Sequence, residues 1–138
     1  MTEPSLPTRP PRRTHETAPF WDGCARGVLV LPRCDRCGEL IWYPRRFCPF
    51  CASTSVSWVE VTGHGTVYSC TVLRRGEGAY REAAPFVLAY VELDEGPRVL
   101  TNIVGVAPEA VTVGMPVQVV FDPAGDGDAI PRFRPAAP

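Results

Sequence analysis

The chain has 138 residues, a formal net charge of −1 and 45% hydrophobic residues, which suits one ordinary domain or a small module joined to one. The balanced charge excludes a strong overall attraction to nucleic acid or to an acidic membrane surface. The first 19 residues hold no apolar stretch, and no later run approaches the ~20 residues of a membrane span. We therefore expect a cytoplasmic protein, in which six cysteines suggest metal binding or catalysis before disulfides.

The first segment, residues 1–18, is rich in Pro, Arg, Thr and Glu and holds few large apolar side chains. Such a segment cannot offset its ordering entropy, so we expect a disordered arm. A short helix near Phe20, with Asp22 as its cap, is expected next. The apolar run at 28–31 then predicts one strand that leads into the first cysteine pair.

Four cysteines follow in the pattern C-x2-C-x10-C-x2-C: Cys34, Cys37, Cys48 and Cys51. Each pair can wrap a tight knuckle whose two sulfurs point at one centre, and two knuckles supply the four thiolates of a closed structural zinc site. The ten residues between the pairs suit a small hairpin, with residues 41–43 as one of its strands.

Two other interpretations of this motif remain open. The CPFC stretch at 48–51 has the spacing of a redox dithiol, but no helix after a strand in a βαβ context is visible around it. A four-thiolate iron site is also chemically possible. Catalytic zinc would need an open coordination position, and four cysteines leave none.

After Cys51 the pattern changes to short strands separated by turn residues, with no amphipathic helix of useful length. The expected strands are 57–63, 66–75, 86–93, 98–106, 115–122 and 129–135. This cadence predicts a small closed or partly open barrel of five or six strands and argues against a βαβ fold. The strands 66–73 and 86–93 are apolar on nearly both faces, so one face must meet a lid, the metal module or a partner chain.

No catalytic group stands out in the remaining sequence. His15 lies in the arm, His64 in a glycine-flanked turn, and Cys24 and Cys70 are isolated thiols, so no nucleophile–base pair can be assembled. All 14 basic residues are Arg, a side chain suited to forked phosphate contacts. An anionic ligand is therefore plausible, and the candidate contacts are Arg45, Arg46, Arg74, Arg75, Trp42 and Phe133.

The ordered stretches FWDG, LPRC-x2-CG, YPRRFCPFC, WVEVTGHGTVYSCTV, PFVLAYVELDEGPRVLTNIVG, VGMPVQVVFD and PRFRP together resemble the DUF35 family. The resemblance covers roughly residues 19–135 and implies a rubredoxin-like zinc ribbon followed by an OB-fold barrel. It implies a mainly β chain with a disordered arm at 1–18, a short helix and ribbon at 19–56 and an OB-fold domain at 57–138. By position, the four cysteines match the zinc ligands of that family.

The resemblance also implies an accessory role: a subunit, without catalysis of its own, that binds a thiolase-fold enzyme in lipid or steroid metabolism. The partner would be a thiolase, an acyltransferase or an aldolase acting on acyl-CoA, in a hetero-oligomer such as α2β2, and the chain would shape the complex or help bind the acyl-CoA. A nucleic-acid-binding zinc-ribbon and OB module is the alternative, because both folds do that work. The net charge of −1 and the absence of Lys argue against it.

Overall fold

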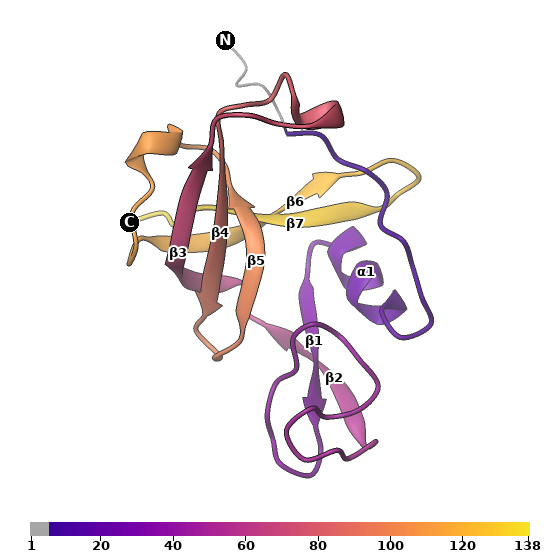
Figure 1. Cartoon of the computed structure of the whole chain (residues 1–138). Coiled ribbons are helices and arrows are strands. Elements are labelled where there is room, and N and C mark those ends of the chain that lie inside the picture. Colours follow the sequence, from indigo (N-terminus) through magenta and orange to yellow (C-terminus); the bar gives the residue numbers. More distant parts are fainter. Residues whose placement is uncertain (1–5) are drawn as a thin grey trace.

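The structure is a computed structural model that describes residues 6–138. It is mainly β, with one short α-helix, a ribbon module and a barrel (Figure 1). In chain order the elements are α1 (Ala18–Ala25), β1 (Leu29–Cys34), β2 (Val56–Val61), β3 (His64–Leu73), η1 (Gly78–Tyr80), β4 (Phe86–Leu93), β5 (Arg98–Ile103), η2 (Pro108–Ala110), β6 (Pro116–Pro123) and β7 (Ala129–Pro135). No helix among the described residues is long and apolar enough to cross a membrane.

The barrel is closed in the strand order β3-β4-β5-β7-β6, which confirms the expected mainly β class and the OB-type barrel. Alternation along β4 explains its two faces, since Val87 and Val91 are buried inside while Leu88 and Tyr90 face outward. Antiparallel ladders join every strand pair except β5 and β7, which run parallel and pair only at Ile103 and Phe133. Of the strand pairs that close the barrel, β5 and β7 therefore have the shortest ladder.

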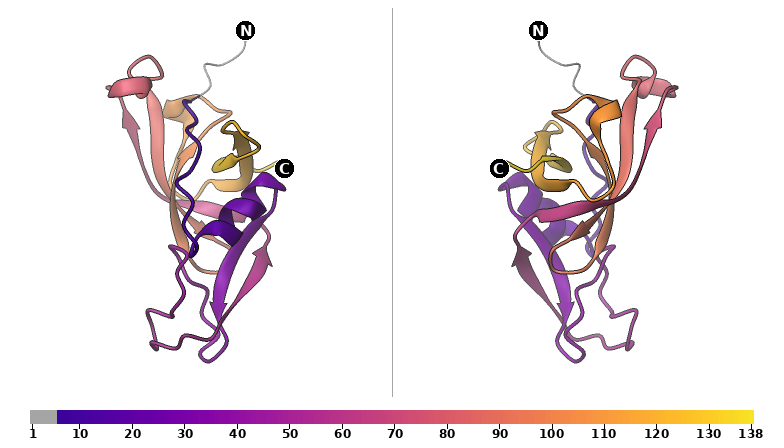
Figure 2. Two further views of the ribbon diagram at one scale, coloured as in Figure 1. Left: turned by 90° about the vertical axis from the view of Figure 1, so that its right-hand side faces the viewer. Right: turned by 90° about the vertical axis from the view of Figure 1, so that its left-hand side faces the viewer.

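The strand β2 does not belong to the barrel, although the sequence counted it among the strands after the cysteines. It pairs with β1 in a separate two-stranded sheet, in the register Leu29 to Val61 through Cys34 to Val56. The barrel thus has five strands, and the β1–β2 sheet joins it to the ribbon. The two side views in Figure 2 show the ribbon projecting from one end of the barrel.

The helix α1 fills the angle between β1 and the barrel. It begins after Thr17 with Pro19 in its first turn, where the missing N–H of proline costs nothing. Asp22 lies inside the helix, so the expectation that it caps the helix is wrong. Gly23 is required for packing, because a Cβ there would lie 2.1 Å from Cγ2 of Val30 in β1. Phe20 enters the barrel core.

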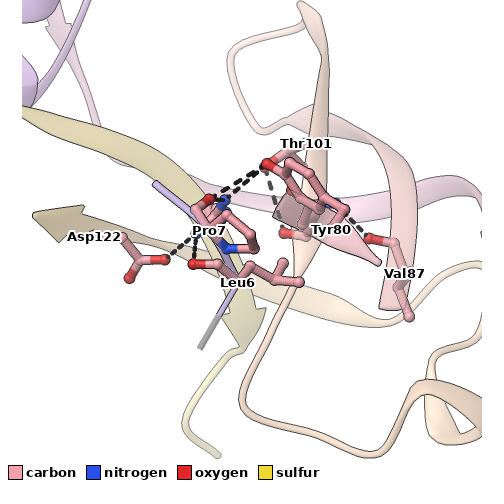
Figure 3. Close-up of polar contacts among 8 residues, drawn as sticks. Leu6, Pro7, Tyr80, Val87, Thr101 and Asp122 are labelled. Carbon is pink, nitrogen blue, oxygen red and sulfur yellow. Dashed lines mark hydrogen bonds and ion pairs between the residues drawn. The ribbon is translucent and has the colours of Figure 1, made fainter. Parts of the chain in front are cut away.

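Part of the N-terminal segment differs from the disordered arm that its composition predicts; residues 1–5 lie outside the described residues. Leu6 is buried, and its carbonyl and that of Pro7 accept hydrogen bonds from Arg132 of β7 (Figure 3). Further along, Arg13 forms ion pairs with Asp22 and with Asp128. Residues 6–17 are thus held against the barrel by two arginines, which is a long-range effect that composition does not reveal.

Candidate functional site

The four cysteine sulfurs meet at the end of the ribbon far from the barrel. Their Sγ atoms all lie within 4.8 Å of one another. The sulfurs of Cys34 and Cys51 and those of Cys37 and Cys48 are each 3.5 Å apart. Four sulfurs about 2.3 Å from a central zinc form a tetrahedron with edges of about 3.8 Å. The donor set and its spacing therefore fit one tetrahedral metal ion.

The two knuckles repeat the same backbone pattern. In the first, Cys34 N donates to the carbonyl of Glu39 and Gly38 N donates to the carbonyl of Cys34; in the second, Cys48 N donates to Ser53 and Ala52 N to Cys48. The residue four places after the first cysteine of each knuckle has a positive φ, +80° at Gly38 and +64° at Ala52. Equivalent positions thus hold a glycine in one knuckle and a strained alanine in the other.

Backbone amides point toward two of the four sulfurs. Cys37 N lies 3.4 Å from Sγ of Cys34, and Phe50 N lies 3.4 Å from Sγ of Cys48. The Cys37 amide lowers the pKa of the Cys34 thiol to about 6. Because the thiolate is the form that binds a metal, this arrangement prepares Cys34 for coordination at neutral pH.

A second layer of contacts ties the first knuckle to β2. The Asp35 carboxylate accepts hydrogen bonds from the hydroxyls of Ser55 at 2.8 Å and Ser57 at 2.7 Å. Hydrogen bonds from Ser57 and Ser55 lower the pKa of the Asp35 carboxyl group. Asp35 N also donates to the carbonyl of Ser55, so the position of the knuckle is fixed relative to the two-stranded sheet.

The ribbon loop, residues 38–47, packs back on α1. Ile41 is fully buried, and the ring of Trp42 lies edge-on to Phe20 with centroids 5.5 Å apart. The expected strand at 41–43 does not form, because the only bridge in this stretch joins Leu40 to Arg33. Trp42 is half-buried in this aromatic contact, so its main contacts are structural.

Arg45 and Arg46 stand in the same loop and face the N-terminal segment. Arg46 N donates to a Glu16 carboxylate oxygen at 2.8 Å, and Arg45 Nε donates to the Tyr43 carbonyl at 3.0 Å. Two neighbouring hollows, of about 320 and 380 Å³, open on either side of Arg45. They share Glu16 and Arg45 and are further lined by His15, Arg46, Val56, Trp58, Arg12, Tyr43 and Phe47. Sequence reasoning missed the contribution of His15 and Glu16, since they were assigned to a disordered arm.

The other predicted ligand contacts lie elsewhere. Arg74 and Arg75 follow β3 at the opposite end of the barrel from the ribbon (Figure 1). Phe133 is 1% exposed in the barrel core, which removes it from any surface site. Its neighbour Arg132 is also buried, at 2% exposed, and donates to Asp122 at 2.8 Å. The six candidate residues therefore do not form one site.

The two thiols outside the ribbon and the histidine of the turn look structural. Burial raises the pKa of Cys24 to about 12, which keeps that thiol protonated and unreactive. Cys70 is half-buried in β3 and packs against the core. His64 is exposed at the start of β3. These positions give no support to a nucleophile at the barrel.

Comparison with known domain families matches both modules. Residues 21–57 match the ChsH2 rubredoxin-like zinc ribbon domain, and residues 58–122 match the ChsH2 C-terminal OB-fold domain. The match agrees with the observed ribbon of four cysteines and the closed five-strand barrel.

Three relatives illustrate the similarity. A probable enoyl-CoA hydratase alpha subunit of Thermomonospora curvata is 40% identical over 86% of this chain, which spans only 37% of that protein. A DUF35 domain-containing scaffold protein of Methanocaldococcus jannaschii is 36% identical, and the match covers 70% of this chain and 69% of the relative. A chain in the solved structure titled Ltp2-ChsH2(DUF35) aldolase is 37% identical with a TM-score of 0.82, covering 92% of this chain and 99% of that one.

Proposed function

Because this chain belongs to the DUF35 family, with the zinc ribbon and OB-fold of ChsH2, we propose that it is an accessory subunit of a thiolase-fold enzyme. In this role it has no catalysis of its own and helps shape a complex that acts on acyl-CoA. The observation that carries the proposal is the match over nearly the whole of a solved chain that is titled as part of a two-protein aldolase. The unreactive environment of Cys24 and the closed set of four thiolates also support it.

The metal in this proposal is zinc, held by Cys34, Cys37, Cys48 and Cys51. When bound to four thiolates, zinc supplies folding free energy and offers no open position to a substrate. The residues of the ribbon orient the sulfurs through the paired knuckles and hold Cys34 as a thiolate. Metal analysis of protein purified without added metal should find one zinc per chain. A red protein that contains iron would contradict the assignment.

The ligand in this proposal is the acyl-CoA ester, whose phosphates would meet Arg45 and Arg46 beside the two hollows of the ribbon. Arginine pairs with phosphate through two parallel hydrogen bonds. Replacing Arg45 and Arg46 together by Ala should weaken acyl-CoA binding about tenfold or more, since hydrogen bonds to charged groups contribute about 1.5–3 kcal/mol each. Zinc content should not change. Isothermal titration of the complex measures this effect.

The matched control uses the second predicted arginine pair. Arg74 and Arg75 lie at the other end of the barrel, so replacing both by Ala removes the same charge without touching the ribbon. If this control weakens acyl-CoA binding and the ribbon variant does not, the ligand lies at the barrel end, and the ribbon assignment is wrong.

The test of the accessory role is a binding experiment. The full chain, tagged and loaded with zinc, is co-expressed with each thiolase-fold enzyme encoded in the same genome. We expect one of them to co-purify at a fixed ratio through size-exclusion chromatography. A chain that remains monomeric beside every such enzyme would contradict the proposed function.

A further inference from the structure

The outward face of the sheet β3-β4-β5 carries an uncovered row of large apolar side chains. Tyr68, Tyr90 and Leu100 are 48%, 45% and 51% exposed. Tyr90 pairs directly with Leu100 across β4 and β5, and on its other side with Ser69 in β3, where a bulge separates Val67 from Ser69. The three side chains therefore form one row across three strands. We name them, with Leu88 and Phe86 on the same face of β4, the sheet patch.

The surface of the sheet patch contains two pockets. Tyr90, Leu100 and Leu88 line an apolar hollow of about 220 Å³. Leu88 and Phe86 line a second hollow of about 450 Å³ toward the loop after β3. The two hollows share Leu88 and thus follow β4 along its outward face. Hollows of this size accept side chains of a partner, as the anchor pockets at the centre of protein interfaces do.

Among the described residues, the loop after β3 covers the Phe86 end of this surface, where the Tyr80 ring lies 5.3 Å from that of Phe86. The helix α1 contacts β1, β6 and β7. In Figure 1 it lies beside β7, and the ribbon extends below the barrel. The N-terminal segment bonds to Arg132 of β7. These elements cover one side of the barrel and leave Tyr68, Tyr90 and Leu100 exposed to solvent.

The charge around the patch helps to decide between the possible occupants. The Arg98 guanidinium lies 3.8 Å from the centroid of the Tyr68 ring, and its Nε donates to Glu92 at 2.9 Å. Arg98 is therefore paired with a neighbouring carboxylate, and the second hollow is bordered by one charge of each sign, Arg75 and Glu77. Binding of single-stranded nucleic acid needs a positively charged groove beside the aromatic rings, which this surface lacks. An apolar centre rich in tyrosine with a rim of both charge signs is typical of protein interfaces.

We propose that the sheet patch is the docking surface for the thiolase-fold subunit, through an apolar protrusion of that subunit that inserts into the hollows beside Leu88. This inference rests on the proposed function and adds the face of the barrel that makes the contact. It separates two tasks on one chain, because the sheet patch holds the protein partner while the ribbon loop holds the acyl-CoA. Tyr68 is preordered by its stacking on Arg98, so docking immobilises few new groups.

The experiment measures the affinity of the full zinc-loaded chain for its co-purifying thiolase-fold subunit by biolayer interferometry. Tyr90→Ala and Leu100→Asp should each weaken binding by about 30-fold or more, as expected of central anchor residues. Tyr90→Phe should retain most of the affinity, because it keeps the ring. The matched control is Phe50→Ala, which removes a ring that is 67% exposed on the second knuckle of the ribbon and should leave the affinity within about twofold.

Zinc content and circular dichroism of each variant verify the fold. If the wild-type chain binds the subunit and the two sheet variants bind equally well, the docking surface is wrong while the proposed function stands. If the wild-type chain binds no thiolase-fold protein, the proposed function fails and this inference fails with it. Loss of self-association, or of affinity for a single-stranded oligonucleotide at low salt, in the sheet variants alone would identify a different occupant and overturn the proposal.

Discussion

The ribbon has a buried apolar cluster of only Cys34, Ile41 and Cys48, whereas the core of the barrel extends from α1 across all five of its strands. Two of the three residues of this cluster are themselves metal-site cysteines. Because the barrel core draws apolar side chains from all five strands, we expect the barrel to stay folded without a metal. We expect that a cluster as small as that of the ribbon does not offset the ordering entropy of its loops. The two modules therefore depend on different forces, although both are formed by one chain.

Removal of the metal should have the largest effect and should act on one module only. Chelation of zinc removes the apparent 10–16 kcal/mol that such sites contribute in small zinc peptides. Residues 34–56 should then lose amide protection in hydrogen-exchange mass spectrometry, while β3 to β7 retain theirs. Cys48→Ser should reproduce this pattern. Simultaneous loss of protection in the barrel would show that the two modules do not differ as described.

Truncation of an aromatic ring in the barrel core should destabilise the barrel and leave the metal site of the ribbon intact. Phe133→Ala removes a side chain that is 1% exposed in the barrel and should lower the free energy of unfolding by about 3–5 kcal/mol. Urea denaturation measures this loss, and metal analysis should still find one zinc per chain. The exposed Phe50 on the ribbon serves as the control, since Phe50→Ala should change the free energy by about 0.5 kcal/mol or less.

The arginine that holds the N-terminal segment should have an intermediate effect. Arg132→Leu leaves the Asp122 carboxylate and the carbonyls of Leu6 and Pro7 without their donor. Breaking a buried pair costs about 3–5 kcal/mol, and the partial exposure of Asp122 reduces this to about 2 kcal/mol. Residues 6–17 should lose amide protection. Arg134→Leu, at an exposed neighbouring position, is the control; a segment that stays protected in Arg132→Leu would contradict its anchoring role.

The smallest effect is expected from substitutions at the equivalent positions of the two knuckles, which should change the stability of the ribbon in opposite directions. Ala52→Gly relieves a left-handed backbone conformation and should stabilise the ribbon by about 0.5–1 kcal/mol, after the larger entropy of the unfolded glycine chain is subtracted. Gly38→Ala, at the equivalent position of the first knuckle, should destabilise it by a similar amount. Competition with a chromogenic zinc chelator measures both changes. Equal zinc affinity in the two variants would contradict the backbone strain assigned to Ala52.

Local patterns predicted the two modules well. The C-x2-C spacing identified the ribbon, and period-two alternation with turn residues placed the strands of the barrel to within a few residues. Long-range pairing was harder, because β2 has the same alternation as a barrel strand and only its partner β1 distinguishes it. The docked segment was missed for a related reason, since Arg132 and Leu6 are 126 residues apart in sequence and the segment between Leu6 and α1 has the composition of a flexible arm.

Some of the residues singled out from the sequence lie together in the structure. Arg45 and Arg46 do lie beside two hollows of the ribbon loop, and the four cysteines do converge. The burial of Phe133 could not be predicted from the sequence. Phe133 lies between two arginines, and because Arg132 is buried as well, the two residues do not follow the alternation of apolar and polar side chains that marks a strand. The sequence did indicate an uncovered apolar face, because the expected strands 66–73 and 86–93 are apolar on nearly both faces. It did not indicate which part of the molecule or which partner meets the outward side chains.

The most direct test of the account is steady-state turnover of the co-purifying thiolase-fold enzyme on its acyl-CoA, with the zinc-loaded chain titrated in. We predict no turnover by the chain alone. Addition of the chain should change the kcat/KM of the enzyme, and this change should saturate at a fixed molar ratio. The Tyr90→Ala variant should not produce the change. Turnover by the chain alone, or an enzyme whose kcat/KM is unchanged at saturating chain, would contradict the accessory role.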